Sequence, residues 1–374
     1  MSGSSHFAKV LKTPEVIALA FGAMIGWSWV FVTGTWLTSA GTLGTLIAFA
    51  VGGCAVTLIG LTYSELASAM PQAGGEHVYT HRALGPRWSF ICTWALLFSY
   101  LNVCLFESVA LPTAVYYLFP NIKLGTLWSV LGGDVDLGFA LVGAGAAALV
   151  GLVNVLGIRT AAIMQTIVTV IIIVSGILLL SGALVFGNLD NAKPLLATPA
   201  TGIITVLIMV PALLVGFDVI PQSAEEIDLP PEKIGRLLVI SITLAVVWYI
   251  AITFAVGVGL TASEQAAGNM ATANAATSLW GTSWAGTLLV LGGIGGIMTS
   301  WNAFVVGASR VLYALSKSGF VPAVFARLHP RYKTPYIGIL AISGLSMIAP
   351  LFGDTILIWL VLGATLLWRY EQRR

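Results

Sequence analysis

Long runs of apolar residues recur from one end of the chain to the other, and they restrict the fold more than any other feature. A helix needs about twenty mostly apolar residues to cross a bilayer. Only 9% of the 374 residues are charged and 58% are hydrophobic, whereas charged residues make up about a quarter of a typical soluble domain. We therefore expect an all-α integral membrane protein with about ten transmembrane helices, at residues 14–39, 43–70, 87–119, 137–156, 159–187, 200–224, 234–260, 280–316, 335–352 and 354–368.

Lys and Arg are unevenly distributed between the two ends of these spans. If the N-terminus lies in the cytoplasm, 15 of the 17 Lys and Arg residues fall on the cytoplasmic side, and only Lys123 and Lys193 fall outside. Cytoplasmic loops carry such an excess, so we expect a multi-pass protein of the cell membrane with a cytoplasmic N-terminus. The net charge of +2 and the lack of a basic face argue against a nucleic-acid partner. The expected partners are the lipid bilayer and a small molecule.

The first and sixth spans each contain residues that interrupt a helix. The first carries "GAMIG" at 22–26, and the sixth carries "GFDVIPQ" at 216–222. Glycine and proline both disfavour a regular helix. Five spans in each half invert the second half in the membrane, which predicts a single transporter domain with repeats at 14–187 and 200–368. Paired interruptions in inverted repeats indicate the binding site of a secondary transporter.

An interrupted helix frees backbone groups that lipid cannot satisfy, so the break must face protein, water or ligand. Freed N–H groups at a helix N-terminus attract a carboxylate, and freed carbonyl groups attract a cation. Gly22 and Gly26 also fit the GxxxG pattern of close helix packing. The matching break in the sixth span favours the binding site over simple packing.

Four motifs resemble those of the amino acid–polyamine–organocation permeases, and they occur in that family's order. They are "GAMIG", "YSELASAMPQAGGEHVYTHRALGP" at 63–86, "GFDVIPQSAEEIDLPPEKI" at 216–234 and "SRVLYALSKSGFVP" at 309–322. The resemblance implies the leucine-transporter fold, with an inverted five-plus-five helix repeat and transport of amino acids or related amines by alternating access.

The resemblance also implies where the substrate binds. The backbone of the first break would hold a substrate carboxylate, carbonyl groups of the sixth-span break would receive the ammonium group, and Phe217 would cover the site. Many relatives have glycine where this chain has Ser28, which narrows the site or adds a hydroxyl group. The implied substrate-binding residues are Met24, Ile25, Gly26, Trp27, Ser28, Val215, Gly216, Phe217 and Asp218.

Two carboxylates fall within the predicted spans, where a charged group is energetically unfavourable and therefore a candidate for function. Asp218 could pair with a substrate amine or accept hydrogen bonds from freed N–H groups of its own broken helix. Glu107, in the third span, could be a protonatable coupling group, could recognise a cationic substrate, or could bond to a neighbouring helix.

The coupling ion is left open between Na⁺, protons and exchange. In sodium-coupled relatives, hydroxyl groups at the positions of Thr299 and Ser300 bind Na⁺ together with carbonyl groups corresponding to Gly22 and Ile25. Oxygen-only ligation suits such a cation, although Thr and Ser also bond to their own helix backbone. Some proton-coupled relatives place a lysine in the fifth span, at about Ile172 here. This chain has no Lys or Arg between Arg159 and Lys193, so we do not expect that lysine-type proton mechanism.

Other functions are weighed against amino acid transport. A polyamine or organic-cation permease would use Asp218 and Glu107 for a more basic substrate. The chain stops at "RYEQRR" after ten spans, whereas members of the family usually have twelve, so we also consider a C-terminally truncated, non-transporting fragment or an amine-binding sensor. An enzyme is not expected, because no convergent nucleophile, base or metal cluster is visible, and no cofactor other than a coupling ion is implied.

Overall fold

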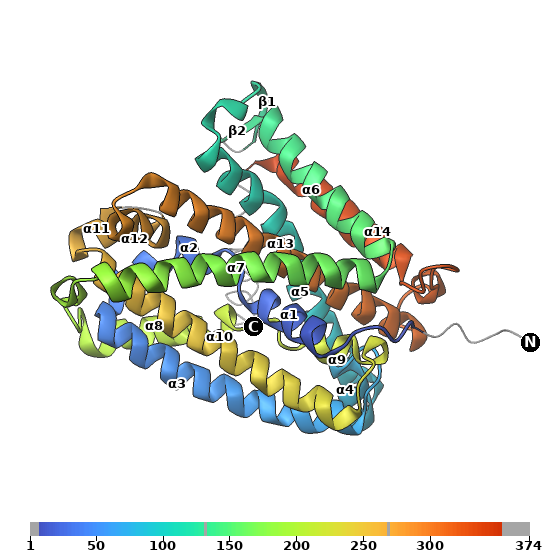
Figure 1. Ribbon diagram of the computed structural model, residues 1–374. Coiled ribbons are helices and arrows are strands. Elements are labelled where there is room, and N and C mark those ends of the chain that lie inside the picture. The colour runs from blue at the N-terminus through green and yellow to red at the C-terminus, as the bar shows by residue number, and fades with distance from the viewer. Residues whose placement is uncertain (1–6, 131–132, 268–269, 354–374) are drawn as a thin grey trace, which may run out of the picture. The chain divides into compact units, whose positions relative to one another are not determined.

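The structure is a computed structural model that describes residues 7–130, 133–267 and 270–353. Helices make up nearly all of its regular structure, and a single two-stranded hairpin was not predicted (Figure 1). Six helices in this part of the chain are long and apolar enough to cross a membrane. They are α3 (Thr33–Ala69), α5 (Pro86–Leu118), α6 (Leu137–Val155), α7 (Ile158–Phe186), α10 (Pro231–Gly259) and α13 (Ser283–Lys317).

The remaining helices are shorter. Three of them are apolar: α1 (Thr13–Met24), α8 (Pro199–Leu213) and α14 (Tyr336–Ile348). Short helical pieces lie between the long ones: α2 (Ser28–Phe31), α4 (Glu76–Leu84), α9 (Val219–Gln222), α11 (Ala262–Ala267), α12 (Ala271–Trp280), and the 3-10 turns η1 (Pro120–Ile122), η2 (Leu189–Ala192), η3 (Ala224–Glu226), η4 (Ala323–Ala326) and η5 (Ala349–Phe352).

The chain forms two compact units. The second unit, residues 9–75 and 162–303, contains both interrupted segments. Within it α3 runs alongside α10 and also packs on α8 (Figure 1). Glycines on α3 permit this approach, because a Cβ atom on Gly53 would lie 2.6 Å from Val246 of α10, and one on Gly52 would lie 2.8 Å from Val210 of α8.

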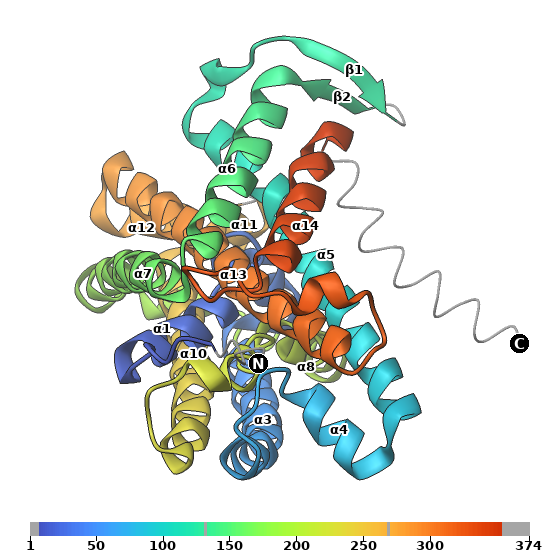
Figure 2. The same cartoon turned by 90° about the vertical axis from the view of Figure 1, so that its right-hand side faces the viewer.

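The first unit contains α4, α5, α6, α14 and the hairpin of β1 (Thr126–Val130) and β2 (Gly133–Asp136). In Figure 2, α6 and α14 lie side by side, and the hairpin connects α5 to α6. Asp136 begins α6, because its carboxylate accepts hydrogen bonds from the N–H groups of Gly138 and Phe139. These are N–H groups that the first turn of a helix leaves unpaired.

Most predicted spans correspond to observed helices. The boundary between the first and second spans is not a loop, because α3 runs through it with one non-helical residue, Gly41 at φ 77°. The predicted span 354–368 lies outside the described residues. Each predicted repeat, 14–187 and 200–368, contributes segments to both units.

Candidate transport site

The first interruption lies between α1, which ends at Met24, and α2, which begins at Ser28. Ile25, Gly26 and Trp27 connect the two helices, whereas Gly22 stays within α1. The carbonyl oxygens of Ile25 and Gly26 face α13, because a Cβ atom on Gly296 would lie 2.8 and 2.5 Å from them. Only a residue without a side chain allows this approach, which accounts for one glycine of "GGIGGI" in α13.

The second interruption lies between α8, which ends at Leu213, and α9, which begins at Val219. Gly216 has φ 120°, a conformation that other residues rarely adopt. A Cβ atom on Gly216 would lie 2.6 Å from the Cβ atom of Ala23 in α1. The second interruption therefore contacts the end of α1 directly before the first interruption, almost two hundred residues away in sequence.

A residue that was not predicted, Tyr249 of α10, bonds to both interruptions. Its hydroxyl group lies 2.9 Å from the carbonyl oxygen of Met24 and 3.4 Å from that of Leu213, and it can donate to either. The Ser28 hydroxyl lies 3.0 Å away. Met24 and Leu213 end their helices, so their carbonyl groups are among those that a helix terminus leaves unpaired. The sequence signal that could have identified Tyr249 was a single tyrosine in the apolar stretch "VVWYIAITF" at 246–254.

The ring of Tyr249 is fully buried and held by other aromatic side chains. It stacks on Phe49 of α3 with centroids 5.1 Å apart, and Trp36 packs edge-on against it at 5.7 Å. Because α3 supplies both neighbours, the packing of α3 on α10 holds the phenol in place.

Asp218 is buried in the second interruption, and its carboxylate accepts a hydrogen bond from the N–H group of Gly216 at 3.0 Å. This hydrogen bond fits the structural one of the two roles that the sequence suggested, and pairing with a substrate amine stays a prediction. The neighbouring Phe217 is half-buried and packs edge-on against Tyr63 of α3, with centroids 5.4 Å apart. Trp27, on the other interruption, packs on Gly293 of α13.

The residues suggested for a cation lie on α1 and α13. Gly22 faces Thr299, whose Cβ atom is 2.9 Å from where a Gly22 Cβ would be. Thr299 and Ser300 are buried. The Thr299 hydroxyl group is 3.1 Å from the carbonyl oxygens of both Gly295 and Gly296, to which it donates within its own helix.

Glu107 lies on α5 in the first unit, where it is 4% exposed. The substrate-binding candidates all belong to the second unit. The substrate-binding candidates therefore lie around the two interruptions of the second unit, whereas Glu107 belongs to the first unit.

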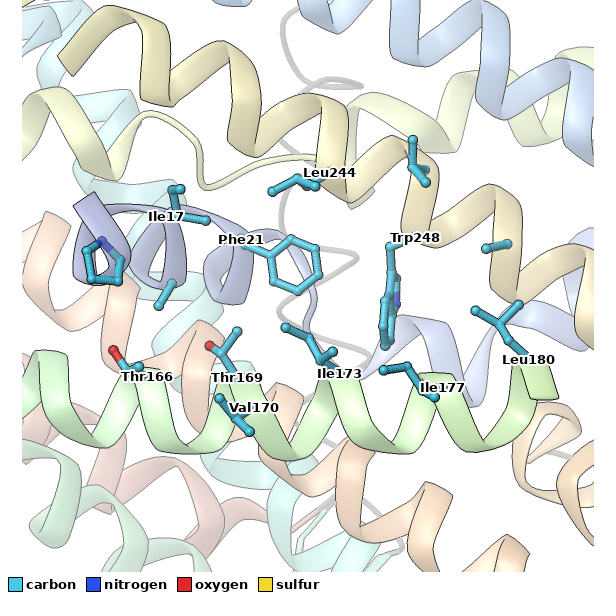
Figure 3. Close-up of a pocket in the computed structure, with 14 residues that line it drawn as sticks. Ile17, Phe21, Thr166, Thr169, Val170, Ile173, Ile177, Leu180, Leu244 and Trp248 are labelled. Atoms are coloured by element: carbon cyan, nitrogen blue, oxygen red, sulfur yellow. The ribbon is translucent and has the colours of Figure 1, made fainter. Parts of the chain in front are cut away.

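A cavity of about 550 Å³ opens beside α1, between α7 and α10. Ile17 and Phe21 of α1, Ile173 and Ile177 of α7, and Trp248 of α10 line it (Figure 3). Among the described residues around it, only Thr166, Thr169 and the Trp248 indole carry polar side-chain atoms. It offers no charge or cluster of donors to an amino acid, so it is distinct in character from the interruptions.

Comparison with known proteins identifies the family. The amino acid permease profile matches residues 11–368, almost the whole chain. The chain belongs to the amino acid permease family. This permease is thus a multi-pass membrane protein and a secondary transporter rather than an enzyme, as the sequence motifs indicated.

The sequence identity between this permease and individual relatives is low. The permease is 26% identical to the branched-chain amino acid permease BcaP of Bacillus subtilis over 90% of this chain and 73% of the relative. It is 23% identical to the methylthioribose transporter of the same organism, again over 90% and 73%. Among solved structures it resembles Mhp1, a nucleobase-cation-symport-1 family transporter in a closed conformation with bromovinylhydantoin bound. The TM-score is 0.59, with 16% identity over 96% of this chain and 78% of Mhp1. This similarity confirms the expected leucine-transporter-type fold.

Proposed function

We propose that this permease moves an amino acid across the cell membrane by alternating access and binds it at the two interruptions. The observation that carries the proposal is the convergence of both interruptions on one hydroxyl group, that of Tyr249. Backbone groups freed at two helix breaks meet at one place, which is the arrangement that secondary transporters of inverted-repeat type use for substrate.

The backbone groups that each interruption exposes determine which end of the substrate it would bind. Residues Met24 to Ser28 run from the last residue of α1 to the first residue of α2, and N–H groups at that start of α2 would attract the substrate carboxylate. Carbonyl groups near Val215, Gly216 and Asp218 would accept hydrogen bonds from the ammonium group. Phe217 would cover the substrate. BcaP, a branched-chain amino acid permease by name, supports an amino acid as the substrate class.

We propose three alternatives for the driving force. Na⁺ would be held by Gly22, Ile25, Thr299 and Ser300, protons would be carried by Glu107, and exchange would need neither. The excess of Lys and Arg on one side of the spans supports a cytoplasmic N-terminus.

Uptake into proteoliposomes tests the proposed function. Purified protein would be offered labelled amino acids and polyamines, with an imposed Na⁺ gradient, a pH gradient, or unlabelled internal substrate. Amino acid uptake in any arm is expected. Uptake of polyamines alone would overturn the amino acid assignment, and silence in all arms from folded protein would overturn transport.

Gly26→Trp tests the location of the site. The new side chain would fill the first interruption, so uptake should be abolished while membrane insertion persists. Gly344→Trp is the matched control, because no atom lies within 4 Å of the Cβ position of Gly344 on α14. Full activity of Gly26→Trp would exclude the proposed site.

A further inference from the structure

A polar cavity of about 480 Å³ lies at the end of α10, within the second unit. It differs from the cavity beside α1, because most of the residues that line it have polar side chains. Among the described residues around it, Glu264 is the only charged one. The lining residues are Leu260 after α10, Glu264 and Ala267 of α11, and Asn274, Thr277 and Ser278 of α12.

The carboxylate of Glu264 is held in place by Thr261, the residue before α11 begins at Ala262. Its Oε2 atom accepts hydrogen bonds from the hydroxyl group and the N–H group of Thr261, at 2.7 and 2.8 Å. These two bonds lower the pKa of Glu264 below its ordinary value, because they favour the charged form. Both bonds go to one oxygen atom, so the Oε1 atom is available to a ligand in the cavity.

Three polar side chains of α12 line the same cavity. Thr277 and Ser278 follow Asn274 by three and four residues, which places all three on one face of the helix. Their side chains form no hydrogen bond among the residues that the structure describes. Hydroxyl groups in other helices, such as those of Thr57 and Thr166, donate to the carbonyl oxygen four residues earlier. The hydroxyl groups of Thr277 and Ser278 do not, so they are available to a ligand.

The two helices that line the cavity pack on the segment that follows the first interruption. The Thr272 hydroxyl group of α12 donates to the carbonyl oxygen of Trp29 in α2 at 2.6 Å. A Cβ atom on Gly34 of α3 would lie 2.7 Å from the carbonyl oxygen of Gln265 in α11. The cavity therefore lies on helices that contact α2, whose first N–H groups are proposed to hold the substrate carboxylate. With a cytoplasmic N-terminus, this end of α10 faces the outside of the cell.

We infer that this cavity is an entry subsite, which binds an amino acid at the outer surface before the amino acid reaches the interruptions. The ammonium group would donate to the carboxylate of Glu264, and the amino acid's carboxylate would accept from the hydroxyl groups of Thr277 and Ser278. A fixed negative charge in a cavity raises the local concentration of a cationic group and so speeds its association. The choice of an amino acid as ligand rests on the proposed function.

Glu264→Gln tests the subsite through the kinetics of uptake. Glutamine has nearly the same shape and keeps an oxygen atom to which Thr261 can donate, but it has no charge. Contacts between exposed opposite charges are weak, so the KM of uptake should rise about threefold. The effect should fall on KM rather than on the maximal rate, because the subsite acts before the substrate reaches the interruptions.

Asp190→Asn is the matched control, because it removes an exposed carboxylate that does not line the cavity. Asp190 belongs to η2, which lies at the same end of α10, where the N–H group of Asn188 donates to the carbonyl oxygen of Val258 at 3.0 Å. This variant should keep the KM of the wild type. A KM of Glu264→Gln equal to that of Asp190→Asn would overturn the inference.

Protection of a thiol detects binding in the cavity directly. Ser278→Cys places a thiol among the lining residues, and Gly26→Trp in the same protein blocks the interruptions. Leucine should slow the alkylation of this thiol by a membrane-impermeant maleimide in a saturable way, by at least about twofold. 4-Methylpentanoate, which is leucine without its ammonium group, should not slow it. Thr282→Cys, exposed just beyond α12 and outside the cavity, should be alkylated equally fast with and without leucine.

The two measurements separate this inference from the proposed function. Protection by leucine in a protein whose wild type takes up nothing would overturn the proposed function alone. Uptake by the wild type without protection of the Ser278→Cys thiol would overturn the inference alone. Equal protection by leucine and 4-methylpentanoate would also overturn the inference, because the charge of Glu264 would then have no part in binding.

Discussion

The hydroxyl group of Tyr249 lies 2.9 Å from the carbonyl oxygen of Met24, across 225 positions of sequence. Met24 is the last residue of α1 and Tyr249 lies in the middle of α10. The bond gives a partner to a carbonyl group that the broken helix cannot satisfy, and it lies at the start of the segment Met24–Ser28 that is proposed to bind the substrate carboxylate. Tyr249 is thus a candidate both for holding the interruption and for responding to substrate.

Tyr249→Phe should weaken transport without unfolding the protein. The ring stays stacked on Phe49, while the Met24 carbonyl group loses its partner. A buried unsatisfied group costs about 1–3 kcal/mol, so we expect about a tenfold change in the KM or rate of uptake. Tyr117→Phe is the control, because Tyr117 is exposed on α5. Equal kinetics for the two variants would show that the hydroxyl group has no role in transport.

Gly216→Ala should destabilise the protein. Alanine strains the backbone at φ 120°, and its Cβ atom would lie 2.6 Å from that of Ala23. Such strain alone costs about 1–3 kcal/mol, so the unfolding temperature should fall by several degrees. Gly145→Ala is the control, because no atom lies within 4 Å of its Cβ position. A Gly216→Ala protein as stable as Gly145→Ala would show that the second interruption does not pack tightly on the end of α1.

Asp218→Asn should retain transport, whereas Asp218→Ala should not. Asparagine keeps an oxygen that can accept from the Gly216 N–H group, and alanine leaves that group unpaired. Hydrogen bonds to charged groups contribute about 1.5–3 kcal/mol, so Asp218→Ala should also lower the unfolding temperature. If Asp218→Asn abolished substrate binding without loss of stability, the charge itself would contact the substrate.

His77 of α4, which lies outside the long apolar helices, should make stability depend on pH. The Thr93 and Ser89 hydroxyl groups donate to backbone oxygens, so the Nδ1–H group of His77 donates to them, and its Nε2 atom accepts from Ser318. Burial, and secondarily His81, lowers the pKa of His77 from 6.5 to about 4.

The folded protein therefore favours neutral His77, and the unfolded chain binds the proton first. The stability from this group is complete above about pH 6.5 and is lost as pH falls toward about 4. The unfolding temperature of the wild type should fall more steeply over this window than that of His77→Gln. Parallel curves for the two proteins would contradict a neutral, buried His77.

Local features of the sequence predicted much of the fold. Hydropathy and helix propensity depend on short windows of residues, so the apolar runs located the helices and the residues of "GAMIG" and "GFDVIPQ" located the two interruptions. The four motifs predicted the family. The hairpin at 126–136 was missed because its strands lie in a short loop between two spans, with no alternating pattern long enough to register.

Tertiary structure alone decided which side chains serve the interruptions. Tyr249 and Gln165 sit in apolar helices and differ from other polar residues there only in their neighbours, Met24 and Ala18, which lie 225 and 147 positions away. Such pairs depend on how segments pack, and packing depends on glycines such as Gly22 and Gly296, whose Cβ positions are occupied by atoms of another segment of the chain. A single sequence contains these residues but not the contacts between them, because the contacts form only when distant helices meet.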